Sequence, residues 1–173
     1  MKSFWRPVWI FITAMVLMGT VSTPAGAVDS LFNNPRWQAL AQQQILEATK
    51  QFYVALNAVL TGDLDPISTI WSHRPDVSDL SSSGGRDMGW NEIYERYQSI
   101  VRMQVGGKIV PQDIVVVADG EMGYSICTEA GESKTPSGNM KTYTKRATNI
   151  FRLEAGKWKL IHHHSDPVQI LEQ

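Results

Sequence analysis

Three consecutive histidines near the C-terminus, His162, His163 and His164, are the residues best suited to acid–base or metal chemistry. Imidazole changes charge near neutral pH and is the commonest transition-metal ligand. In an extended strand, His162 and His164 share one face with Trp158, while His163 points to the other face. Three ligands of one ion cannot be arranged in this way. The pattern therefore favours a hydrogen-bonded pair, lining a pocket or a contact between copies, and we expect no metal.

Carboxylates are the candidate catalytic acids and bases. Asp113 lies among apolar residues of an expected strand, where it could face inward, and Asp76 and Asp79 lie in a turn and the short strand that follows. An isomerase or cyclase needs such a carboxylate beside a hydrogen-bond donor. We take Asp113 and Asp76 as the candidate bases, with a histidine or Tyr97 as partner. No spacing singles out one pair.

Large aromatic residues and one arginine could form the wall of a ligand pocket. Arg146 shares a strand face with Thr148 and Ile150; it would need an anion if that face is inward, and would be solvated if it is outward. Aromatic residues at helical spacing suit a pocket wall or the core. The predicted ligand-binding residues are Trp71, Trp90, Tyr97, Arg146, His162 and His164.

Nucleophilic and cofactor chemistry find little support. The single cysteine, Cys127, cannot form an internal disulfide and lies in a strand-like stretch, so a buried thiol is expected. The sequence has no Gly-x-Ser-x-Gly motif. The glycines in the loop over 81–85 are not followed by the Lys-Ser/Thr of a phosphate-binding loop. We expect no cofactor.

Hydrophobic periodicity predicts three helices. Asn34-Pro35 is a typical helix start, apolar residues then recur at spacings of three and four, and Gly62 is a typical end. A short helix is expected over 66–71 and a third from 88 to 103. From residue 109 the period becomes two, which predicts strands over 109–118, 121–130, 139–153 and 157–165. Helices followed by an antiparallel meander are typical of an α+β domain.

The N-terminus has the features of a cleaved secretory signal peptide over 1–27. Lys2 and Arg6 are its only charges, residues 8–21 are mostly apolar, and Ala25-Gly26-Ala27 is a small-x-small cleavage pattern. The apolar run is shorter than the ~20 residues of a membrane-spanning helix. We expect cleavage after Ala27, a single domain over 28–173, a periplasmic or secreted location, and no membrane attachment after cleavage.

The charge balance bears on the partner class. Without residues 1–27 the chain has 14 basic and 17 acidic residues, a net charge of −3 with histidines neutral. Nucleic-acid-binding proteins carry a basic cluster or stripe, and none stands out here. The sequence therefore argues against nucleic acid as a partner.

The closing segment carries a family resemblance. Gly156-Lys157-Trp158, apolar residues and then His162-His163-His164-Ser165 resemble the last strand of SnoaL-like members of the nuclear transport factor 2-like superfamily. The segment 144–152, Trp71 with Pro75-Asp76-Val77, and Gly89-Trp90 resemble the same group, and the likeness covers most of 36–168. The chain is also similar to the association domain of calcium/calmodulin-dependent protein kinase II.

The resemblance implies a cone-shaped fold, with three N-terminal helices packed on a strongly bent, mainly antiparallel sheet. It also implies a small-molecule pocket at the wide end and a homodimer formed through the sheet. Asn149 stands where the kinase domain has a pocket arginine, so that arginine's role does not carry over. Three functions stay open. We favour a small-molecule binder. The second is a cofactor-independent enzyme, either an isomerase or cyclase of the ketosteroid isomerase type or a hydrolase-like enzyme, and the third is an oligomerisation module.

Overall fold

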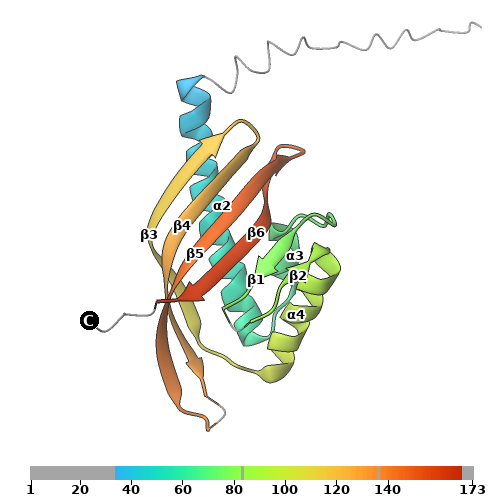
Figure 1. Ribbon diagram of the computed structural model, residues 1–173, viewed down its shortest axis with the longest axis vertical. Coiled ribbons are helices and arrows are strands. Elements are labelled where there is room, and N and C mark those ends of the chain that lie inside the picture. Colours follow the sequence, from blue (N-terminus) through green and yellow to red (C-terminus); the bar gives the residue numbers. More distant parts are fainter. Residues whose placement is uncertain (1–33, 83, 136, 169–173) are drawn as a thin grey trace, which may run out of the picture.

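The computed structural model describes residues 34–82, 84–135 and 137–168 (Figure 1). The predicted signal peptide and its cleavage site lie outside these residues. The elements in chain order are α2 (Pro35–Thr61), α3 (Asp65–Ile70), β1 (Ser78–Leu80), β2 (Asp87–Met88), α4 (Gly89–Met103), β3 (Lys108–Asp119), β4 (Met122–Lys134), β5 (Met140–Glu154) and β6 (Lys157–Pro167). The predicted α+β fold, with three helices ahead of an antiparallel meander, is confirmed.

Local signals set the ends of α2. The side chain of Asn34 accepts a hydrogen bond of 2.9 Å from the backbone N–H of Arg36, and Pro35 occupies the first turn. Gly62 ends the helix in the left-handed conformation, with φ 104°. The buried residues of α2 form a stripe: Ala41, Ile45, Thr49, Phe52, Tyr53, Ala55, Leu56 and Val59.

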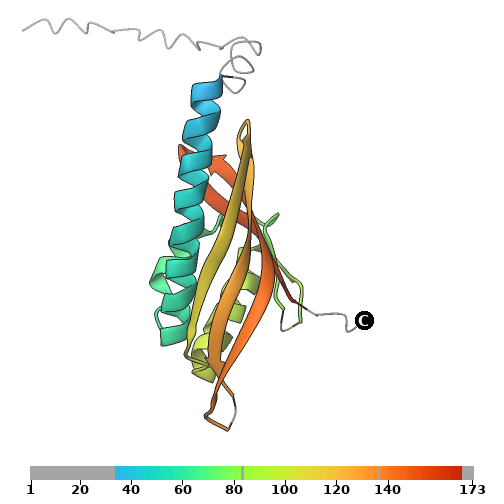
Figure 2. The same cartoon turned by 90° about the vertical axis from the view of Figure 1, so that its left-hand side faces the viewer.

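All six strands belong to one sheet, in the order β2-β1-β6-β5-β4-β3. The pairing is antiparallel except between β1 and β6, which run parallel. The helix α2 runs along one side of the twisted sheet, and α3 and α4 lie near its lower end (Figures 1 and 2). We call the sheet face that packs on α2 the inner face and the opposite face the outer face.

Close packing of α2 on the sheet depends on Gly123. A Cβ at this position would lie 2.2 Å from Cδ1 of Ile45 and 2.8 Å from the carbonyl oxygen of Val117. Any side chain at position 123 would therefore have to displace the Ile45 side chain of α2 and the neighbouring backbone of β3. Around this contact the core contains Phe52, Phe151 and other fully buried side chains, each of which stabilises the fold by roughly 1.5–3 kcal/mol.

A bulge in β6 decides which residues of the last strand face inward. His162 pairs with Ile150 and Leu160 pairs with Phe151, so Ile161 is left without a partner. Leu160 and His163 are consequently both buried on the inner face. The predicted sharing of a face by His162 and His164 holds, but Trp158, which donates to Gln44 of α2, lies on the other face.

Among the described residues, no helix combines the length and the apolar character needed to cross a membrane.

Candidate functional site

A cavity of about 490 Å³ lies between the helices α2 and α4 and the inner face of the sheet. We call it the inner pocket. Its apolar wall includes Leu56, Leu60, Ile100, Met103 and Ile109. Its polar residues include Asp79, Glu129, Lys145, His163 and Ser165. Ligand sites in proteins typically combine an apolar wall with a few convergent polar groups in this way.

His163 lines the inner pocket and is held there as a neutral ring. Its Nδ1 lies 2.8 Å from Oδ1 of Asn149, whose Nδ2 donates to Oγ of Ser125 at 3.2 Å. Because Oδ1 of Asn149 can only accept, Nδ1 of His163 carries the proton. Burial lowers the pKa of His163 to about 3. Its Nε2 therefore keeps a free lone pair at neutral pH.

Asp79 on β1 is a buried carboxyl group with an unsatisfied oxygen. Its residue exposure is 4%, and within the described part of the chain its Oδ1 has no hydrogen-bond partner. Burial and the neighbouring Asp87 raise the pKa of Asp79 to about 7, against an opposing effect of Arg96. A carboxyl group in this state can give or take a proton near neutral pH.

The hydroxyl group of Tyr97 links Asp79 to the core. It is near enough to the Asp79 carboxyl group to lower its pKa slightly, and it accepts a hydrogen bond of 3.3 Å from Nε1 of Trp71. The parallel register of β1 and β6 makes Asp79 the direct partner of His163. Strand pairing therefore brings a titratable acid and a free imidazole nitrogen to the same wall of the inner pocket.

Glu129 is a second buried carboxyl group beside His163. Its Oε1 accepts a hydrogen bond of 3.0 Å from Tyr53 and lies 3.9 Å from Nε2 of His163. Burial raises the pKa of Glu129, and the cation of Lys145 opposes this effect. Cys127, whose sulfur is 3.1 Å from the Tyr53 hydroxyl group, is buried as the sequence predicts, and burial raises the pKa of its thiol.

A family model for the SnoaL-like domain matches residues 45–168, most of the chain. The chain belongs to the SnoaL-like family. Its fold is that of the NTF2-like superfamily: an NTF2-like protein from Salmonella enterica has a TM-score of 0.68 at 13% identity, with 78% of this chain and 95% of that chain covered. No curated protein matches the chain.

Two further solved structures of this superfamily are similar. One, from Streptomyces avermitilis, carries the name of a dehydratase from the NTF2-like family; it is 25% identical, with a TM-score of 0.65, and 74% of this chain and 97% of that chain are covered. The other, from Thiobacillus denitrificans, carries the name of a calcium/calmodulin-dependent protein kinase type II association domain. It is 20% identical, with a TM-score of 0.60, and 70% of this chain and 93% of that chain are covered.

Of the sequence-predicted site residues, Tyr97 lines the inner pocket of this SnoaL-like domain. Asp113, Arg146 and His164 do come together, but in a hollow on the outer face. Asp113 is exposed at a bulge of β3, where its φ is 52°, and Arg146 pairs with Asp166. The expectation that Asp113 faces inward fails because the bulge interrupts the alternation of β3.

The remaining predicted residues also lie away from the inner pocket. Trp71 is buried in the core with 1% exposure, and Trp90 stacks on His73 with 4.4 Å between ring centroids. His162 has its Nδ1 2.8 Å from Oγ of Ser78. Among the described residues, no group of three or more histidine, cysteine, aspartate or glutamate side chains could hold a metal ion.

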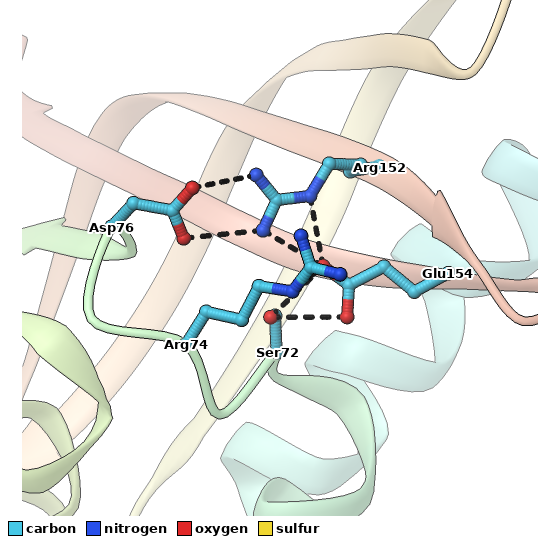
Figure 3. A network of polar contacts seen from close by, with 5 residues as sticks. All are labelled: Ser72, Arg74, Asp76, Arg152 and Glu154. Atoms are coloured by element: carbon cyan, nitrogen blue, oxygen red, sulfur yellow. Dashed lines mark hydrogen bonds and ion pairs between the residues drawn. The ribbon is translucent and has the colours of Figure 1, made fainter.

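Asp76 belongs to a surface ion-pair network instead of the pocket (Figure 3). Arg152 donates to both oxygens of Asp76, at 2.8 and 3.2 Å, and its Nε donates to Glu154 at 2.8 Å. The hydroxyl group of Ser72 donates to the same Glu154 carboxylate at 3.0 Å. The network joins the turn over 72–76 to β5. This turn immediately precedes β1, the strand that carries Asp79.

Asp79 and His163 are candidate functional residues of the inner pocket that sequence reasoning did not select. A signal for Asp79 was available, because Val77 and Asp79 alternate as the inward positions of a short strand, and both are buried. No comparable signal existed for His163. Simple alternation from Trp158 places His163 outward, and the bulge at Ile161 reverses this.

Proposed function

We propose that the protein binds a small molecule in the inner pocket and catalyses a proton transfer on it without a cofactor. Nε2 of His163 acts as the base and the carboxyl group of Asp79 as the proton donor. The observation that carries this proposal is the direct pairing of Asp79 with His163 on one wall of the pocket. Titratable groups whose pKa values are shifted apart in one cavity are typical of acid–base sites.

Two reactions suit this pair. In an isomerisation, His163 takes a proton from carbon next to a carbonyl group, and Asp79 protonates the carbonyl oxygen or the distant carbon. In a dehydration, His163 takes the carbon-bound proton while Asp79 protonates the hydroxyl group that leaves as water. The dehydratase name of the Streptomyces avermitilis relative supports the second reaction.

Hydrogen–deuterium exchange of 2-tetralone in D₂O tests the proposal without knowledge of the natural substrate. The protein should accelerate exchange of the protons next to the carbonyl group, measured by NMR. The variants His163→Gln and Asp79→Asn should each lose roughly 10²-fold or more of this acceleration. Asp113→Asn, which changes an exposed carboxylate on the outer face, is the matched control and should keep it. Equal exchange in all four proteins would refute the proposal.

We also propose that the outer face forms a homodimer. Several apolar side chains on β3 and β4 are between 37% and 53% exposed, and they include Val115, Val117, Met122, Tyr124 and Ile126. Contiguous exposed apolar surface of this kind marks interaction sites in soluble proteins. A sheet face can pair with a second copy of itself about a two-fold axis, and the inner pockets stay open in such a dimer.

Export is a further proposal, supported by the signal-peptide features of residues 1–27. N-terminal sequencing of the protein from the periplasm or medium of its host should find Val28 as the first residue. Recovery of the intact chain from the cytoplasm alone would contradict it.

A further inference from the structure

Lys145 is a pocket cation that does not pair with the carboxylate beside it. Lys145 and Glu129 are direct partners in the antiparallel ladder of β4 and β5, and both line the inner pocket. The Glu129 carboxylate accepts from Tyr53 at 3.0 Å and lies toward His163. Over residues 34–82, 84–135 and 137–168, no ion pair within 4.0 Å involves Lys145.

The ammonium group of Lys145 lies instead over the ring of Tyr143, with Nζ 4.5 Å from the ring centroid. The face of an aromatic ring attracts a cation. The ring itself is fixed, because it packs on the backbone of Gly131, its partner in the ladder. A Cβ at Gly131 would lie 2.2 Å from Cε2 of Tyr143. The geometry therefore holds a positive charge at the pocket wall, four residues along β5 from Lys141, an exposed residue that also lines the pocket.

This charge is poorly hydrated. Burial lowers the pKa of Lys145, and Glu129 partly offsets that effect. A partly buried ammonium group gains most from an anion that can hydrogen-bond to it. The third cation of the pocket, Arg96, is already paired with Asp87. Two cations of the pocket therefore stay open to a ligand. These are Lys145 and, nearer the solvent, Lys141.

We propose that the ligand of the inner pocket is an amphipathic carboxylate, whose anionic group binds Lys145 and whose apolar body lies against Leu56, Leu60 and Ile109. This inference rests on the proposed function, since it concerns the same pocket. It deepens that function by naming the substrate class. The ammonium group of Lys145 is near enough to His163 to contribute to the lowered pKa of that ring. A carboxylate bound at Lys145 therefore leaves the neighbouring part of the ligand close to the proposed base.

Calorimetric titration of three probes with the same apolar body tests this inference: 4-phenylbutanoate, 4-phenylbutan-1-ol and 4-phenylbutylamine. At neutral pH the purified protein should bind the carboxylate about tenfold more tightly than the alcohol, because an anionic acceptor hydrogen-bonds a partly buried ammonium group more strongly than a neutral hydroxyl group does. The amine should bind more weakly than the alcohol.

Variants then assign the preference to Lys145. Lys145→Met should bind the carboxylate and the alcohol equally while keeping the alcohol affinity, which reports an intact pocket; Lys145→Gln is the second neutral variant should the first misfold. Lys145→Arg should retain the preference. Lys50→Met, which removes an exposed charge from α2, is the matched control for net charge and should bind like the unchanged protein.

The outcomes separate this inference from the proposed function. Equal affinities for carboxylate and alcohol in the unchanged protein, or a preference that survives in Lys145→Met, would overturn the inference and leave acid–base catalysis standing. A preference confined to proteins with a cation at position 145, without exchange of 2-tetralone, would support the inference and overturn the catalysis. Binding of none of the probes would overturn the inference and the ligand-binding part of the proposed function.

Discussion

Asp79 of β1 and His163 of β6 are opposite each other in the parallel pairing of these two strands. Burial acts on the two groups in opposite directions, because it disfavours the charged form of each. It raises the pKa of Asp79 to about 7 and lowers the pKa of His163 to about 3. Near neutral pH the pair therefore combines an uncharged imidazole base with a carboxyl group that is close to half-protonated.

Replacing Asp79 by asparagine should stabilise the protein at alkaline pH. The pKa of Asp79 is about 7 in the folded protein, against an ordinary 3.8. The stability that the protonated Asp79 carboxyl group contributes is therefore fully present below about pH 4 and is lost as the pH rises through 7. Urea denaturation should show Asp79→Asn gaining on the order of 3 kcal/mol relative to the original protein between about pH 4.5 and 8. A constant difference across this range would mean that Asp79 is ionised throughout.

Replacing His163 by glutamine should make the protein less sensitive to acid, because glutamine has no ring to protonate. The pKa of His163 falls from an ordinary 6.5 to about 3 in the folded protein. The stability associated with the neutral ring is therefore present above pH 6.5 and is lost as the pH falls toward 3. The melting temperature should fall less steeply with decreasing pH in His163→Gln than in the original protein. His164→Gln, on the exposed outer side of the same strand, should follow the original curve.

The network around Arg152 should contribute to stability and to the position of Asp79. Arg152 hydrogen-bonds Asp76 and Glu154, and its side chain is only 20% exposed. We expect Arg152→Gln to lower the free energy of unfolding by about 1 kcal/mol and to slow exchange of 2-tetralone. Arg146→Gln, which breaks an exposed pair with Asp166, should change neither measurement. Equal effects of the two substitutions would contradict a positioning role for the network.

A charge placed on the outer face should dissociate the proposed homodimer. Ile126 is 44% exposed on β4, where it pairs with Val115 of β3 within the apolar surface. A carboxylate there would be desolvated at the interface, so Ile126→Glu should sediment as a monomer in analytical ultracentrifugation. Val54→Glu changes a 68% exposed side chain on α2 and should leave the dimer intact. A monomeric original protein would refute the dimer directly.

Local sequence signals determined the elements of this fold. Asn34, Pro35 and Gly62 mark the ends of α2 in the sequence, and its apolar stripe is buried as the spacing indicates. The change of period after residue 109 predicts the meander, because alternation is a property of neighbouring residues. The closing strand pointed to the SnoaL-like family, which the family model confirms.

Apart from Tyr97, which the sequence analysis selected, the polar residues of the inner pocket were decided by tertiary structure. Bulges at Ile161 and near Asp113 change which side chains face inward, and they depend on pairing with strands distant in sequence. The insertion of β1 beside β6 makes Asp79 the neighbour of His163, and nothing in either segment by itself specifies that contact. Periodicity predicts which residues share a face of a strand, whereas long-range pairing determines which of the two faces meets the core.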